Sequence, residues 1–196
     1  MAYFLCIRHA QSELNAAGLW QGQADPPLSN EGIRQAHALA AMLSREPFAQ
    51  LAALVSSDLQ RASQTAAILG EALGLAPERH EGLREMDVGR WSGRSHAEIS
   101  ARWPEEYARF RAGDENLRPG GGESRGMLRE RALQAFREVS ARWRGRELGV
   151  VTHLGVLRVV QPGLELANAG VLRLPTCVAD WPAASRGAPH TRVGAL

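Results

Sequence analysis

The stretch YFLCIRHAQSELN (residues 3–15) joins a short apolar run directly to a group of polar side chains. Tyr3 to Ile7 are suited to a buried strand, and Arg8 and His9 follow without a gap. In open α/β sheets, ligands bind beyond the carboxyl ends of the strands. The stretch therefore predicts a buried strand whose end delivers a guanidinium group and an imidazole to a binding site.

Two further apolar runs are followed by residues of the same kind. LAALVS (51–56) leads into a helical pattern that carries Arg61, and ELGVVTH (147–153) ends at His153. We expect these side chains to meet Arg8 and His9 at one edge of the sheet. Guanidinium groups bind phosphate oxygens in a bidentate manner, and the N-terminus of a helix adds backbone donors. The strand ends together predict an anion site.

Strand and helix patterns alternate along most of the chain. This alternation predicts a three-layer α/β/α fold with a mostly parallel central sheet, in a single domain of residues 1–196. A small helical, lid-like excursion over the active-site end is expected at about 89–125. One further helix is predicted to begin after the N-cap Ser29, and another to run from Ser57 or Asp58 to the C-cap signal Gly74. Two more helices are expected in 123–143 and 154–160. A strand is expected near 78–83, and edge strands or a hairpin in 168–181.

Composition narrows the class of protein. The 196 residues carry a net charge of +2, and 44% of them are hydrophobic, which fits one globular domain. No apolar run approaches ~20 residues and no secretory signal pattern is visible, so we expect no membrane partner. Cys6 and Cys177 are isolated, which favours a cytoplasmic location. Every basic residue other than histidine is arginine. These arginines are scattered beside acidic residues, so we expect no nucleic-acid partner.

The residue types favour metal-independent phosphoryl transfer. The chain has no P-loop pattern and no clustered metal ligands, so we expect no metal and no cofactor. A neutral imidazole could attack phosphorus and form a covalent phosphohistidine, which splits one displacement into two steps. The leaving alkoxide needs a proton, and LREMDVGRW (83–91) offers Glu85 or Asp87 as the general acid.

At this point the sequence resembles a known family. RHAQSELN (8–15) is similar to the Arg-His signature of the histidine phosphatase superfamily, which includes the cofactor-dependent phosphoglycerate mutases. Further blocks follow in the order that the family has, and together they cover residues 3 to about 160. They are WQGQADPPLSNEG (20–32), SSDLQRASQTA (56–66), LREMDVGRWSG (83–93), PGGGES (119–124) and VTHLGVLR (151–158).

The resemblance implies a role for each matching residue. His9 would be the nucleophile and Glu85 the proton donor, with Asp87 left open as an alternative. The remaining residues would bind the phosphoryl group or line its pocket: Arg8, Arg61, His153, Asn15, and the backbone around Gln21, Gly22 and Leu154. Leu154 replaces a glycine that is usual in the family, which makes the wall bulkier. The segment after residue 158 is shorter than in relatives, which leaves that edge of the sheet undefined.

The predicted function is a metal-independent phosphomonoester hydrolase that acts through a phosphohistidine on a small phosphorylated metabolite. A phosphoglycerate mutase is the alternative within the family, although mutases are usually longer in the middle region and use a lysine that this chain lacks. A catalytically weak protein that binds phosphorylated ligands is the alternative outside enzymes, but a pure binder needs no proton donor. The sequence leaves the substrate open, as well as the choice between a monomer and a homodimer.

Overall fold

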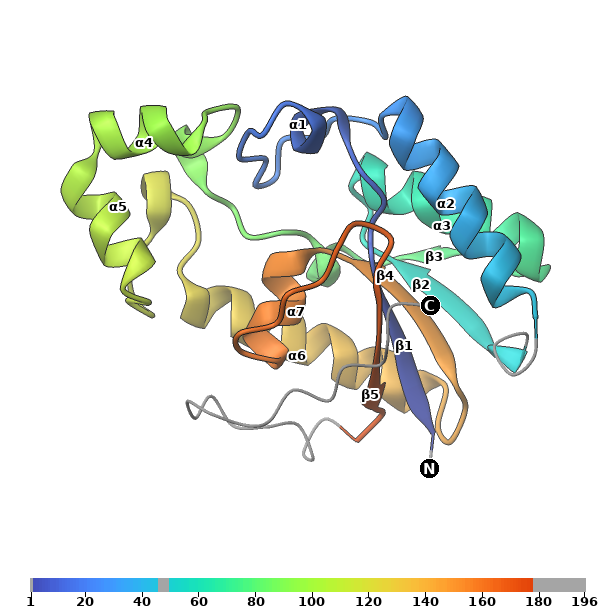
Figure 1. The fold of residues 1–196 in the computed structure, drawn as a ribbon. Helices are drawn as coiled ribbons and strands as arrows, with labels where there is room; N and C mark the ends of the chain where they lie inside the picture. The colour runs from blue at the N-terminus through green and yellow to red at the C-terminus, as the bar shows by residue number, and fades with distance from the viewer. Residues whose placement is uncertain (1, 46–49, 178–196) are drawn as a thin grey trace.

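The computed structural model describes residues 2–45 and 50–177. Its central sheet has the strand order β3-β2-β4-β1-β5 (Figure 1). The pairs β1–β4, β2–β4 and β2–β3 are parallel, and only β5 runs antiparallel, against β1. The strands are β1 (Tyr3–Arg8), β2 (Ala53–Ser56), β3 (Glu78–Arg79), β4 (Leu148–Thr152) and β5 (Val171–Pro175).

Helices cover both faces of this sheet (Figure 1). The longer ones are α2 (Asn30–Leu43), α3 (Gln60–Leu73) and α6 (Arg125–Arg142), and the shorter ones are α1 (Glu13–Ala16), α4 (His96–Arg102), α5 (Pro104–Arg111) and α7 (Leu154–Val160). Single 3-10 turns among the described residues are η2 (Glu81–Leu83), η3 (Gly89–Trp91) and η4 (Pro119–Gly121). The predicted α/β fold with a mostly parallel sheet is confirmed.

The alternation of side chains along β1 decides which helices lie on which face. Phe4 and Cys6 pack in a core cluster with residues of α6 and α7. Leu5 and Ile7 point to the opposite face and join a second cluster with residues of α2 and α3. Because successive strand residues point to opposite faces, an uninterrupted apolar strand is what a sheet covered on both sides requires.

The register of the strands brings the carboxyl ends of β1 and β4 together. Arg8 is the register partner of Thr152 in the parallel pair β1–β4, and the N–H of His9 donates to the carbonyl oxygen of Thr152 at 2.9 Å. The residues that follow the two strands, His9 and His153, are therefore neighbours at the same edge of the sheet. Their ring centroids are 5.0 Å apart.

Two predicted boundaries were wrong. The strand expected at 78–83 is only Glu78–Arg79, because the ring of His80 accepts a hydrogen bond from Gly82 N at 3.0 Å and caps the turn η2. Helix α3 begins at Gln60 and not near Ser57 or Asp58. The side chains of Ser57 and Asp58 bind His153 and Arg84 instead of capping the helix.

The region after η2 stands away from the sheet. Turns η3 and η4 with helices α4 and α5 form a separate layer at the end of the sheet where β1 and β4 finish (Figure 1). The role of this region as a lid stays a prediction. Edge strand β5 lies in the predicted 168–181 segment, whose last residues, from 178 on, are outside the described residues. None of the helices in the described part of the chain is long and apolar enough to cross a membrane.

Candidate active site

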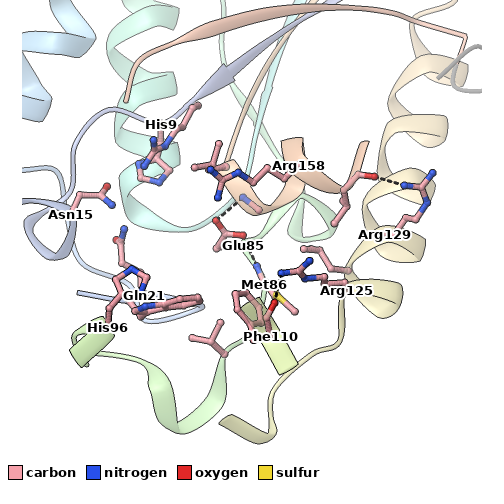
Figure 2. A pocket seen from close by; sticks show the side chains of 18 of the residues that line it. His9, Asn15, Gln21, Glu85, Met86, His96, Phe110, Arg125, Arg129 and Arg158 are labelled. Atoms are coloured by element: carbon pink, nitrogen blue, oxygen red, sulfur yellow. Dashed lines mark hydrogen bonds between the residues drawn. The ribbon is translucent and has the colours of Figure 1, made fainter. Parts of the chain in front are cut away.

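A pocket of about 600 Å³ lies at the carboxyl end of β1 (Figure 2). Most of the predicted site residues line it: Arg8, His9, Asn15, Gln21, Gly22, Glu85 and Leu154. Arg61 and His153 do not line the pocket. Both are completely buried, and the contacts described below place them directly behind its floor.

His9 is held as a neutral imidazole. Its Nδ1 lies 2.7 Å from the carbonyl oxygen of Ala10. A carbonyl can only accept, so Nδ1 must carry the proton and Nε2 keeps its lone pair. Burial, with a further contribution from the charge of Arg61, lowers the pKa of His9 to about 3. His9 therefore presents an unprotonated nitrogen across the whole neutral range.

His153 lies behind His9 and is oriented by Ser57. Its Nε2 is 2.8 Å from Ser57 Oγ. That hydroxyl accepts a bond from the N–H of Leu59 at 3.3 Å, and in the Nδ1–H tautomer of His153 it donates its own hydrogen to Nε2. Nδ1 of His153 then carries the proton, and it has no hydrogen-bond partner in the described part of the protein. Burial, followed by the charge of Arg61, holds the pKa of His153 well below its usual value.

Arg61 is a buried charge that forms no ion pair with a carboxylate of the described residues. Its two terminal nitrogens donate to the carbonyl oxygens of Ala24 at 2.8 Å and Gly22 at 2.9 Å. Its Nε has no partner among the described residues. Desolvation by burial lowers the pKa of Arg61, although the negative charge of Glu85 opposes this effect. A buried cation that no ion pair neutralises is costly, and an anionic ligand nearby would compensate it.

The β1–α1 loop supplies Arg8 and Asn15. Arg8 Nη1 donates to the carbonyl oxygen of Leu166 at 2.6 Å, which fixes the guanidinium at the carboxyl end of β1. The side-chain oxygen of Asn15 accepts bonds from Ser12 and from Asn168 Nδ2, at 3.2 Å from the latter. The amide nitrogen of Asn15 is consequently the end left for a ligand.

Glu85 reaches the pocket from the loop after η2. Its Oε1 accepts from the N–H of Met86 at 2.8 Å and its Oε2 accepts from the N–H of Gly155 at 3.1 Å. Asp87 points into a turn instead, where its Oδ1 accepts from Gly89 N at 2.8 Å, and it does not line the pocket. Of the two acids left open by the sequence, only Glu85 is placed to meet a bound molecule.

Three residues at the site were not predicted. Gly155 is the first of them. The site needs a glycine at this position, because a Cβ there would lie 2.0 Å from Glu85 Oε1. Ser57 orients His153, and Asn168 donates to the backbone oxygen of His9 at 3.1 Å as well as to Asn15. Gly155 and Ser57 both lie inside sequence blocks of the site, so their position was a usable signal. Asn168 lies in the segment whose geometry the sequence left undefined.

The pocket continues beyond Glu85 into a wider region. One side is aromatic: the Trp20 ring stacks edge-on with Phe110 at 5.2 Å and His96 at 5.1 Å between centroids. The other side is basic and carries Arg125, Arg129 and Arg158. In Figure 2 Arg125 and Arg129 lie on the other side of Glu85 from His9 and Asn15, and Arg158 lies next to Glu85. No group of three or more His, Cys, Asp or Glu side chains in the described residues is arranged to hold a metal ion.

Comparison with known proteins gives one consistent result. The family model for the histidine phosphatase superfamily (branch 1) matches residues 4–177. A metal-independent phosphoserine phosphatase of Arabidopsis thaliana is 37% identical over 157 residues, which are 79% of this chain and 65% of that protein. This chain thus spans slightly less than two thirds of that relative.

A second relative is similar over a larger share of its length. The glucosyl-3-phosphoglycerate phosphatase of Mycobacterium tuberculosis is 37% identical over 185 residues, which are 90% of this chain and 77% of that protein. A solved structure of the mycobacterial glucosyl-3-phosphoglycerate phosphatase complexed with VO3 superposes with a TM-score of 0.81 at 32% identity, and covers 89% of this chain and 93% of its own.

Proposed function

The chain belongs to the histidine phosphatase superfamily (branch 1) and is a phosphatase of small phosphorylated metabolites, and we propose that it works through a phosphohistidine formed on His9. The observation that carries this mechanism is the state of His9. Its Nδ1 is bonded to a backbone carbonyl and its Nε2 is left with a lone pair at the floor of the pocket. A nucleophile needs that combination of orientation and charge.

In the first step, the Nε2 lone pair of His9 forms a bond to phosphorus while the bond from phosphorus to the leaving oxygen breaks. The carboxylic acid of Glu85 gives its proton to that oxygen, so an alcohol leaves and not an alkoxide. The backbone donors at Met86 and Gly155 hold the Glu85 carboxyl group at the pocket wall. This fixed position supports Glu85 as the acid in preference to Asp87.

In the second step, water attacks the phosphohistidine. The Glu85 carboxylate takes a proton from the water, the P–N bond breaks, and the electron pair returns to Nε2. Inorganic phosphate leaves, and both His9 and Glu85 are back in their starting states. Glu85 thus acts as a general acid in the first step and as a general base in the second step.

The residues around His9 stabilise the transferring group. Arg8 and Asn15 line the pocket and offer donors to phosphoryl oxygens. Nε of Arg61 and Nδ1 of His153 are buried polar atoms without partners in the described protein, and both lie behind His9. Donors that are fixed before the reaction cost no reorganisation when charge develops, so we assign the four residues to stabilisation of the transition state.

A mutase reaction is not favoured. The chain has no lysine, which the resemblance leads us to expect in mutases, and the named relatives described above are phosphatases. We also propose a cytoplasmic location, in keeping with the free thiols of Cys6 and Cys177. Small phosphorylated molecules are the proposed partners, with neither nucleic acid nor membrane among them.

The test of this mechanism is chemical trapping. Rapid quenching during turnover of a radiolabelled phosphomonoester in the presence of EDTA should yield an acid-labile, base-stable phosphoenzyme. His9→Ala should give none and should turn over no substrate. His37→Ala, which changes an exposed histidine on α2, should behave as the wild type. A phosphoenzyme of undiminished yield in His9→Ala would exclude His9 as the nucleophile.

A further inference from the structure

The basic side of the pocket carries three arginines that form no ion pair with the described residues. Arg125 and Arg129 project from α6 and Arg158 from α7, and we refer to these three as the arginine wall. Arg131 on the same helix shows the contrast, since Glu123 holds its guanidinium in a bidentate pair at 2.8 and 3.0 Å.

Each member of the arginine wall is positioned without being neutralised. A guanidinium has five N–H donors, and one of them is anchored here to a backbone carbonyl in each case. For Arg125, Arg129 and Arg158 the acceptors are the carbonyl oxygens of Phe110, Val159 and Leu164 respectively. Arg125 also lies over the Phe110 ring, 4.6 Å from its centroid. The anchors fix the groups in place, and most of their other donors have no partner among the described residues.

The charge on this side of the pocket is positive. Four arginines (Arg8, Arg125, Arg129 and Arg158) and two glutamates (Glu85 and Glu115) line the pocket, so its lining has a formal excess of two positive charges. Arg158 also lies close enough to the phosphate end for its charge to contribute to lowering the pKa of Arg8, after the larger effect of burial. The arginine wall therefore begins near the phosphate end and extends away from it.

The volume of the pocket exceeds what a phosphoryl group needs. A space of about 600 Å³ falls in the range that holds whole small-molecule ligands. We propose that, given the phosphatase function above, the arginine wall binds a second anionic group of the substrate. The preferred substrates are then phosphomonoesters that carry a carboxylate or a second phosphate away from the bond that is cleaved.

Matched substrate pairs test this directly. 3-Phosphoglycerate and glycerol 3-phosphate differ only in a carboxylate that replaces a hydroxymethyl group. Fructose 1,6-bisphosphate and fructose 6-phosphate differ in a second phosphate. The wild type should show a higher kcat/KM for the member with the second anionic group in at least one pair, by about 10- to 100-fold, which is the effect of one or two charge-assisted hydrogen bonds. The pair that shows the preference identifies the second group.

Variants connect the preference to the arginine wall. Arg125→Gln and Arg129→Gln, singly and together, should reduce the ratio of kcat/KM within the preferred pair toward one, mainly through KM. Arg137→Gln is the matched control, because Arg137 is exposed on the same helix and does not line the pocket. Where a variant fails to fold, the wild type can be measured in increasing NaCl instead. Screening of the charges by salt should reduce its ratio of kcat/KM within the preferred pair.

The outcomes separate the two proposals. Hydrolysis of p-nitrophenyl phosphate, which has no second anion, reports on the phosphatase mechanism alone. A protein that cleaves it but does not prefer the substrate with the second anionic group in either pair, or whose preference survives both in the double variant and in high salt, overturns the assignment of the arginine wall and leaves the mechanism standing. A protein that cleaves none of these esters refutes the phosphatase mechanism, and the assignment falls with it.

Discussion

Glu85 and Asp87 lie two residues apart on one loop, but their surroundings differ. Glu85 lines the pocket and is held by the N–H groups of Met86 and Gly155. Asp87 accepts from Gly89 N and stabilises a turn. A general acid matters most when the leaving group is strongly basic, because an alkoxide needs a proton far more than a nitrophenolate does.

Glu85→Gln should therefore be selective in its effect. We expect kcat/KM for alkyl phosphates to fall by about 10²- to 10⁴-fold, the usual contribution of a general acid, with a much smaller loss for p-nitrophenyl phosphate. Arg61→Ala should slow both classes of substrate to a similar extent, since charge stabilisation serves every leaving group. Steady-state kinetics on a series of leaving groups gives the comparison, with Asp87→Asn as the control. Selective loss in Asp87→Asn alone would move the acid to Asp87.

Single residues were predictable where their chemistry is carried by side-chain type and position. His9 and Arg8 could be placed at the pocket from the sequence because they follow a predicted strand, whereas the preference for Glu85 over Asp87 came from the family resemblance. The orientation of His153 by Ser57 could not be, since it depends on a contact between residues that are 96 positions apart. The same holds for the burial of Arg61 behind the pocket floor, which only the packed structure decides.

At the scale of elements, the close contact between α7 and the loop of Glu85 depends on a glycine. The N–H of Gly155 donates to Glu85 Oε2, and a Cβ at this position would lie 2.0 Å from Oε1 of the same carboxyl group. The group that would be displaced is the end of a flexible side chain and not the backbone. The conflict therefore disturbs the acid more than the fold.

Gly155→Ala should lower activity with little change in stability. The displaced Glu85 should lose its alignment, so we expect the same selectivity for basic leaving groups as in Glu85→Gln, with at least about a tenfold loss on alkyl phosphates. Urea denaturation should show a midpoint close to that of the wild type. Gly126→Ala is the matched control, since a Cβ there meets nothing closer than 3.7 Å. Equal rates in Gly155→Ala and wild type would show that Glu85 needs no such positioning.

Elements with strong local signals were predicted well, and those decided by long-range contacts were not. The N-cap at Ser29 and the C-cap at Gly74 are as expected, with Gly74 at a φ of 66°. The short helix α1 was not among the predicted elements, because four helical residues stabilised by the Ser12 and Asn15 capping box leave little periodicity in the sequence. The predicted strand at 78–83 was longer than β3, because His80 caps the turn η2 and ends the strand at Arg79.

At the scale of the whole molecule, the two buried histidines link the site to the stability of the fold. His9 is 3% exposed and His153 is completely buried. The charged groups that lower their pKa values are Arg61 and Arg8 for both rings, with Arg131 and His9 added for His153. In the unfolded chain both rings would titrate near 6.5. The folded protein therefore keeps them neutral at a pH where the unfolded chain takes up protons.

This difference makes the stability depend on pH. Above about pH 7 both states are neutral at these rings and no stability is lost; below about 6.5 the unfolded state binds more protons, so the free energy of unfolding falls as the pH falls. Each histidine contributes a slope of up to about 1.4 kcal/mol per pH unit, and this contribution continues down toward the folded pKa of about 3 for His9.

Urea denaturation at intervals between about pH 7.5 and 5 measures the slope, in a window above the usual titration of carboxylic acids. His9→Asn should remove about half of it. A free energy of unfolding that stays constant across this window, or a slope unchanged in His9→Asn, would mean that His9 takes up its proton without unfolding, and the neutral nucleophile would lose its support.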